Sequence, residues 1–294
     1  MNTLPSVVPA LRRHACRRNA ASRKRRPSRH FSSIIRRPMR STQSFRLRPL
    51  SLCCAILIDI ISTHAVAGVI VSGTRFIYPA GDREITVKVD NTGNQPSLVQ
   101  AWLDDGDFRS HPGAVKAPFV LMPPIFRVDP GKGQTLRIVY TGDPLPQDKE
   151  SVFWLNVLDI PPKSAGGTSE NELQLAFRSR IKVFFRPAGL DGDGAISAAK
   201  AVKWTIAAAP DGKGRVLRAI NASPFNVIVL SIGIKHGGRT YKIDDGAMIA
   251  PHSAHLFAGD TPLPDLQVGS KFEYSTINDF GTDMKWQGVL QTLP

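Results

Sequence analysis

Few side chains of this chain stand in patterns that could perform chemistry. His252 and His255 lie close together, but neither an acid nor a cysteine stands beside them at metal-ligand spacing. The run Asp191–Gly194 begins like a calcium loop, yet it lacks the glutamate that such a loop carries at its twelfth position. Asp104–Asp107 could contact a cation, although a solvated turn is the simpler interpretation. The sequence therefore predicts neither a metal site nor a cofactor.

Motifs of covalent and phosphate chemistry are missing as well. The chain has no Gly-x-Ser-x-Gly elbow. Pro130–Thr135 is glycine-rich, but it lacks the spacing of a phosphate-binding loop and precedes a strand-like segment instead of a helix. The cysteines, Cys16, Cys53 and Cys54, all precede residue 68, so the remainder can form neither a disulfide nor a thiolate site. We expect a protein that is not an enzyme and takes no small-molecule substrate.

The net charge of +14 would suggest a nucleic-acid or membrane-surface partner if it were spread over the whole chain. It is concentrated at the start instead, because residues 1–67 hold 14 Lys and Arg but only one acid, Asp59. The remaining 24 basic and 23 acidic residues almost cancel. Nothing in residues 68–294 resembles a surface that follows phosphates, so we expect no nucleic-acid partner.

The first 67 residues have the features of a secretory signal. An apolar run from Leu50 to Ile61 follows positive charge, and Ala65–Ala67 offers a small-residue cleavage site before Gly68. The run is too short to span a bilayer. The basic stretch ahead of it is longer than a signal needs. Either it forms a basic arm, or the true start is Met39, which is the interpretation that we favour.

Strand patterns dominate residues 68–294. Apolar and polar residues alternate over Ile85–Asp90, Leu136–Thr141 and Leu173–Arg178, while Ser151–Ile160 is more continuously apolar, as in a central strand. Similar strands, about ten residues apart, follow a glycine-rich stretch that we take as a linker at 189–194. Only residues 195–201 could form a helix. The chain is therefore expected to be all-β, with a sandwich in each half.

Three blocks carry a specific resemblance. Residues 145–161, LPQDKESVFWLNVLDIP, are similar almost position for position to the signature of the periplasmic pilus-assembly chaperones of the chaperone–usher pathway, the PapD-like family. Residues 118–128 resemble that family's Pro-Pro-hydrophobic-Phe-Arg segment, and residues 180–187 resemble its domain junction. The resemblance implies two immunoglobulin-like β-sandwich domains joined at an angle as a boomerang, here 68–187 and 188–294. The short Pro162–Asn171 loop favours the short-loop subfamily.

The resemblance also implies a function in the periplasm. Members bind, fold and cap fimbrial (pilin) subunits by lending a strand to a sandwich that lacks one, a mode of strand addition known for this pairing. They then deliver the subunit to an outer-membrane usher for pilus assembly. Two other classes compete with this interpretation. A fimbrial structural subunit or adhesin would be expected to carry a cysteine pair and one incomplete sandwich, and a secreted hydrolase would need a convergent site that the sequence lacks.

The donor strand would carry Leu173, Leu175 and Phe177, three large apolar residues at a spacing of two. Alternation alone leaves open whether they face a client or the chain's own core. The resemblance implies that they enter the client. The same strand could also pair with a second copy of the chain.

Register needs a fixed point, because a strand can slip by two residues without changing its inward face. The resemblance implies that Arg75 and Lys182 grip the client's C-terminal carboxylate. It further implies that Glu150, Arg186 and Asp279 form ion pairs between the two domains. Without the resemblance, all five would be read as ordinary surface charges.

Overall fold

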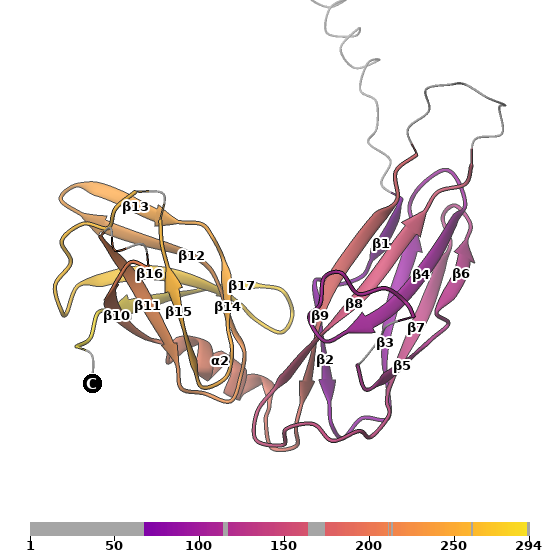
Figure 1. Cartoon of the computed structure of the whole chain (residues 1–294), viewed down its shortest axis with the longest axis horizontal. Helices are drawn as coiled ribbons and strands as arrows, with labels where there is room; N and C mark the ends of the chain where they lie inside the picture. The colour runs from indigo at the N-terminus through magenta and orange to yellow at the C-terminus, as the bar shows by residue number, and fades with distance from the viewer. Residues whose placement is uncertain are drawn as a thin grey trace, which may run out of the picture. The chain divides into compact units, whose positions relative to one another are not determined.

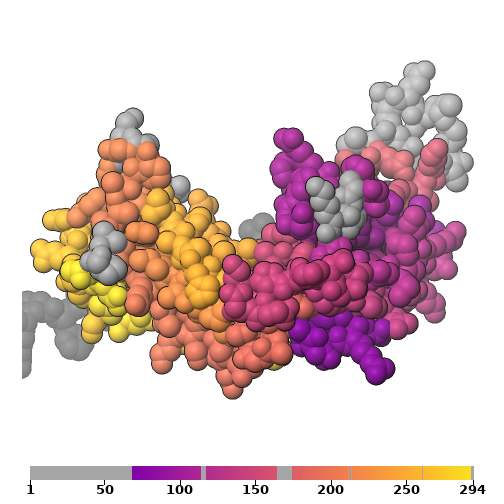
Figure 2. Space-filling model, turned by 60° about the horizontal axis from the view of Figure 1, so that its bottom comes forward, coloured from indigo at the N-terminus to yellow at the C-terminus, as the bar shows by residue number. Residues whose placement is uncertain are grey.

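A computed structural model describes residues 68–113, 117–163, 174–210, 212, 214–259 and 261–292. The expected secretory leader and all three cysteines lie outside these residues, as do Leu173 and most of the Pro162–Asn171 loop. The described part is almost entirely strand and turn, which confirms the all-β, two-domain expectation. Figure 2 shows the two domains in a space-filling view, with the first domain beginning in indigo and the second ending in yellow.

The first domain is a sandwich of two sheets (Figure 1). One sheet has the order β1-β3-β7-β5, with strands Val69–Val71, Ile85–Asn91, Gly133–Tyr140 and Phe119–Met122. The other has the order β2-β9-β8-β4-β6, with strands Arg75–Pro79, Phe177–Arg186, Ser151–Ile160, Ser97–Asp104 and Ile125–Val128. The alternating residues predicted for β3 and β7 supply Val87, Leu136 and Ile138 to a fully buried core between the sheets.

The chain enters this sandwich by changing sheets. β1 pairs antiparallel with β3, but after a short break β2 pairs parallel with β9 in the opposite sheet. Gly73 lies in that break with a φ of 152°, a backbone conformation that is strained for residues with a Cβ. The segment from β1 to β2 therefore connects the two sheets at the start of the domain.

The second domain is also a sandwich (Figure 1). One sheet has the order β10-β11-β15, with strands Lys203–Ala208, Arg215–Asn221 and Ser253–Phe257. The other has the order β13-β12-β16-β17, with strands Arg239–Ile243, Val227–His236, Lys271–Ile277 and Asp283–Val289, and β14 (Ala247–Ile249) also pairs with β12. Trp204 is the centre of the core, with ring contacts to Phe257, Phe272 and Tyr274.

The glycine-rich stretch expected as a linker is partly helical. Helix α2 covers Gly192–Lys200, so it begins three residues and ends one residue before the 195–201 segment predicted from the sequence. Asp191 caps it, because its side chain accepts a hydrogen bond from the Gly194 N–H at 2.7 Å. A Cβ at Gly194 would stand 2.7 Å from the ring of Phe225. Glycine is thus required there by close packing of the helix, not by flexibility.

The strand predicted from Leu173 onward also differs from the structure. β9 begins at Phe177, and residues 174–176 lie outside any strand. The neighbouring strand explains the difference, because Phe177 pairs with Asp159 and β8 ends one residue later, at Ile160. Alternation in the sequence cannot reveal where a strand runs out of partners.

Each sandwich has a buried asparagine at the end of one strand, and its side chain connects the turn that follows to a neighbouring strand by hydrogen bonds. The Asn221 amide donates to the carbonyl oxygens of Phe225 at 2.7 Å and Ile249 at 3.2 Å, while its oxygen accepts from the Ser223 N–H at 3.0 Å. Asn91 does the same in the first domain, donating to the carbonyl oxygens of Gln95 at 2.8 Å and Val128 at 3.0 Å. Both side chains are buried, so their bonds replace those that water would make.

Replacing Asn221 by alanine should therefore destabilise the chain by about 1–3 kcal/mol, because buried carbonyl groups lose their donors. Urea denaturation followed by tryptophan fluorescence measures this change. The exposed Asn94 is the control, and Asn94→Ala should leave the midpoint close to that of the parent chain. Equal midpoints for the two variants would contradict the role given to Asn221.

Candidate functional site

Strand β9 has one complete edge and one incomplete edge. Along one side, β8 pairs with Phe177 through Phe185. On the other side, β2 pairs only with Lys182 through Arg186. Within the described part of the chain, the first half of β9 therefore has a neighbour on one side only. Its outward backbone N–H and C=O groups form a ready template for a strand from another chain.

The side chains along β9 divide between two faces. Val183 and Phe185 are buried in the core of the first domain. Phe177 has the same parity and so projects to the same face, but its side chain is 64% exposed. Leu175, just before the strand, is 53% exposed. Of the two alternatives, burial in the chain's own core does not describe Leu175 and Phe177. Leu173 lies outside the described residues.

Arg75 and Lys182 are direct partners in the parallel pairing of β2 with β9, at the point where the open edge ends. The Arg75 Nη1 donates to the Ile277 carbonyl oxygen at 3.3 Å, but its buried Nε has no hydrogen-bond partner. Neither cation forms an ion pair with an acid among the described residues. A buried donor without an acceptor is costly, so this pair is suited to receiving an anion.

Electrostatics support that conclusion. Burial lowers the pKa of Lys182, and the nearby charges of Arg75 and Arg180 lower it further. Burial also lowers the pKa of Arg75, and Asp279 partly offsets this effect. Two like charges held together away from water repel one another, and an incoming carboxylate would relieve that repulsion.

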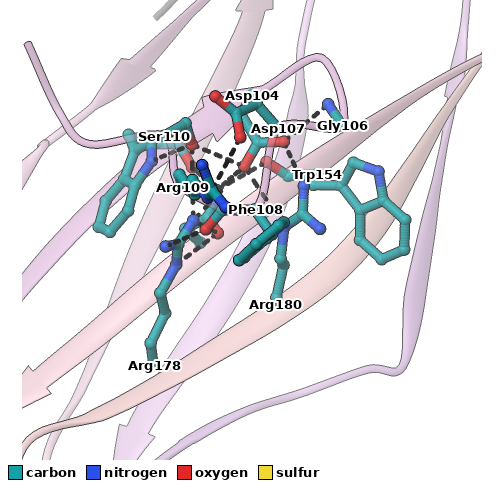
Figure 3. A network of polar contacts seen from close by, with 11 residues as sticks. Asp104, Gly106, Asp107, Phe108, Arg109, Ser110, Trp154, Arg178 and Arg180 are labelled. Atoms are coloured by element: carbon teal, nitrogen blue, oxygen red, sulfur yellow. Dashed lines mark hydrogen bonds and ion pairs between the residues drawn. The ribbon is translucent and has the colours of Figure 1, made fainter. Parts of the chain in front are cut away.

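The Lys182 side chain lies against an aromatic ring, with its Nζ 4.4 Å from the centroid of the Trp154 ring. The guanidinium of Arg180 stands over the same indole at 4.3 Å. Arg180 in turn forms an ion pair with Asp104 at 2.5 Å (Figure 3). Trp154 and Arg180 were not predicted as site residues, and Asp104 was considered only within the Asp104–Asp107 turn. The sequence signal for Arg180 is its alternation with Arg178 and Lys182 on one face of the strand.

Asp104 corrects the solvated-turn interpretation of Asp104–Asp107. It is only 1% exposed, and it accepts hydrogen bonds from Gly106 and Ser110 (Figure 3) and another from Asn156. Burial alone would raise the pKa of Asp104, but hydrogen bonds from Arg180, Asn156, Gly106 and Ser110 hold it below the usual value. The carboxylate therefore organises the end of β4 and the outer face of the sheet.

Glu150, Arg186 and Asp279 lie in one network. Arg186 contacts Glu150 at 2.7 Å and Asp279 at 2.7 Å, and the second oxygen of Glu150 accepts from the Asn226 N–H at 2.8 Å. Arg186 and Glu150 are 6% and 5% exposed, so the alternative of independent surface charges is wrong for this pair. Buried charges must be paired in this way, because an isolated one is expensive to remove from water.

No group of three or more metal-ligating side chains occurs in the described residues. No helix found there is both long enough and apolar enough to cross a membrane.

Comparisons with known proteins cover both domains. Residues 68–191 match the family model "Pili and flagellar-assembly chaperone, PapD N-terminal domain", and residues 197–287 match "Pili assembly chaperone PapD, C-terminal domain". The probable fimbrial chaperone YadV of Escherichia coli is 39% identical over 240 residues, 81% of this chain and 96% of YadV. The chaperone FimB/FhaD of Bordetella pertussis is 41% identical over 254 residues, 83% of this chain and 97% of its own length.

Solved structures of chaperones are also similar to this chain. The crystal structure of YadV superposes with a TM-score of 0.64 at 38% identity, covering 76% of this chain and 100% of that one. A structure of the Salmonella enterica SafA pilin in complex with the SafB chaperone gives a TM-score of 0.62 at 27% identity, covering 78% of this chain and 99% of the matched chain.

The buried ion network predicts a large loss on removing its cation. Arg186→Leu should destabilise the chain by about 3–5 kcal/mol, because Glu150 would keep its buried charge without a cation to pair with. Arg215 is the matched control, since its pair with Asp265 is largely exposed, and Arg215→Leu should cost less than about 1 kcal/mol. Urea denaturation of both variants tests this difference. Similar losses would show that burial does not set the strength of the network.

Proposed function

Because the chain belongs to the PapD family of pili-assembly chaperones, we propose that its first domain completes an unfinished fimbrial subunit with strand β9. The subunit's edge strand would pair with the open half of β9, and Leu175 and Phe177, with Leu173 before them, would fill its core. Arg75 and Lys182 would bind its C-terminal carboxylate. The observation that carries this proposal is the half-open edge of β9 with its exposed apolar side chains.

Exposed apolar side chains supply the main driving force for capture. Fully burying a residue such as leucine or phenylalanine stabilises a complex by roughly 1.5–3 kcal/mol, before the cost of ordering the chain. In the free protein, Leu175 and Phe177 are in contact with water over much of their surface. A subunit that lacks a strand has the complementary defect, an apolar groove. Each surface is unfavourable in water, and pairing them removes both.

A carboxylate anchor would set the register that apolar contacts leave free. The client strand would run along β9 and end where β2 begins, so its terminal carboxylate would reach the Arg75–Lys182 pair. The unpaired Arg75 Nε supports this placement, because it is a buried donor aimed at no acceptor in the described structure. Charge-assisted hydrogen bonds of this kind contribute about 1.5–3 kcal/mol each.

The cellular setting follows from the same proposal. The signal-like leader would export the chain to the periplasm, where fimbrial subunits arrive before assembly. The chain would then hand its client to an outer-membrane usher, and no catalytic step by the chain itself is involved. The SafA–SafB complex supports a pilin as the client class, since the matched chain of that chaperone–pilin complex covers 78% of this chain. No comparison favours the alternative of a fimbrial subunit or adhesin.

Donor activity should depend on the apolar face of β9. Phe177→Glu should abolish the one-to-one complex recovered with a fimbrial subunit from periplasm, because a charge would enter the client's core. Val268→Glu is the matched control, since Val268 is also 64% exposed but belongs to the second domain. Size-exclusion chromatography with mass spectrometry detects the complex. Retention of the complex by Phe177→Glu would contradict donation by this strand.

Loss of the anchor should weaken the complex without unfolding the chaperone. Lys182→Met should lower affinity for the subunit by about 10- to 150-fold, because one charge-assisted bond to the carboxylate disappears. Lys200→Met serves as a control at an exposed helical lysine. Titration calorimetry with the purified subunit measures both. If Lys182→Met binds as tightly as the parent chain, Lys182 is not an anchor.

A further inference from the structure

Four residues form a single row across the outer sheet of the first domain. Asp104 of β4 pairs with Trp154 of β8, Trp154 pairs with Lys182 of β9, and Lys182 pairs with Arg75 of β2. Directly paired residues project to the same side of a sheet and lie close enough for their side chains to interact. The row therefore leads from a buried carboxylate, across an indole, to the two cations of the proposed anchor.

Trp154 is the only described residue whose ring contacts two cations. The Lys182 ammonium stands 4.4 Å from its centroid, and the Arg180 guanidinium stands 4.3 Å from it. An indole face attracts cations, and the attraction grows when water is excluded. Lysine has a long, flexible stem, so a free ammonium would sample many positions before a client arrives. A ring beneath it restricts that sampling.

The second cation on the Trp154 ring, Arg180, is itself held in place. Arg180 forms an ion pair with Asp104, which accepts a hydrogen bond from Ser110 (Figure 3) and another from Asn156. Arg180 also counts among the charges that destabilise the protonated form of Lys182. Pairing with Asp104 holds the guanidinium over the indole and offsets part of its charge. Without this tether, Arg180 could compete with Lys182 for the client's carboxylate.

We propose that Trp154, with Arg180 tethered to Asp104, is a positioning residue that holds the Lys182 ammonium beside Arg75 before a client carboxylate binds. This inference rests on the proposed function of Arg75 and Lys182 as the anchor. It adds a preformed cradle to the two cations, so that the ordering of Lys182 precedes binding and does not oppose it. Trp154 does not touch the client in this arrangement and acts only through Lys182.

Two variants separate positioning from packing. Trp154→Leu removes the aromatic face but keeps an apolar side chain, whereas Trp154→Phe keeps a smaller aromatic face. Phe108 is the control, because Arg109 stands over its exposed ring at 5.4 Å and no side-chain contact joins that ring to Lys182, Trp154 or Asp104 in the described structure. Phe108→Leu therefore removes another cation–aromatic contact of the first domain and leaves the Asp104 network in place. Circular dichroism and thermal melting establish that each variant is folded.

The first readout needs no client. In NMR spectra of the exported chain, the ε-methylene protons of Lys182 should be shifted upfield by the ring current of Trp154. The shift should vanish in Trp154→Leu, persist in part in Trp154→Phe, and remain unchanged in Phe108→Leu. An unshifted Lys182 in the parent chain would overturn the inference, because the ammonium would then not rest on the ring.

The second readout uses two peptides with the C-terminal strand sequence of the subunit that co-purifies with the chain, one ending in a free carboxylate and the other in an amide. The preference for the carboxylate should fall by about 2- to 30-fold in Trp154→Leu, with Trp154→Phe in between and Phe108→Leu unchanged. An unchanged preference in Trp154→Leu overturns the positioning role. If the parent chain shows no preference at all, the anchor itself fails, and the positioning role fails with it even though the ring-current shift persists.

Discussion

The unequal pairing of β9 is the constraint on which the rest of the first domain depends. A strand in the middle of a sheet satisfies its backbone groups on both sides, and β9 does so only in its second half. That half also contributes Val183 and Phe185 to the core. The strand is therefore paired on both edges and packed against the core only over the residues that β2 pairs with. The first half extends from this support with an open edge and exposed apolar side chains. Rigid support and open edge belong to the same ten-residue strand.

An open apolar edge carries a risk of non-specific association, and the outer face of β9 limits it. Arg178, Arg180 and Lys182 place a cation at every second residue of the strand, and all three lie on that face. Arg178 and Arg180 interact with tryptophans and with Asp104 instead of being left to solvent. Charged residues on an exposed edge strand are a recognised protection against unwanted pairing. The strand thus presents its apolar residues on one face and a fixed row of charge on the other.

Much of this architecture can be predicted from the sequence. Alternation located β3 and β7, and the apolar run at Ser151–Ile160 correctly indicated a central strand. The cross-strand partners could not be predicted in the same way. Asp104 lies 50 residues from Trp154 and 76 from Arg180, and the local pattern of acids and glycine favoured a solvated turn. Its burial is set by β8 and β9, which reach it through tertiary pairing alone. The early start of α2 also depends on a tertiary contact. Glycine has low helix propensity, but position 194 requires it because the Phe225 ring leaves no room for a Cβ.

The parallel pairing of β2 with β9 has a consequence for any chain that joins the open edge. β2 occupies the same side of β9 that a guest strand would use, and it begins at Arg75. A guest that advances along β9 in the direction of β2 therefore meets the end of another strand. Its last residue must stop at that junction, since the hydrogen-bonding positions beyond it are already filled. The fold therefore limits how many residues a guest can carry after its final strand. A guest with extra residues there would have to bend away from the sheet.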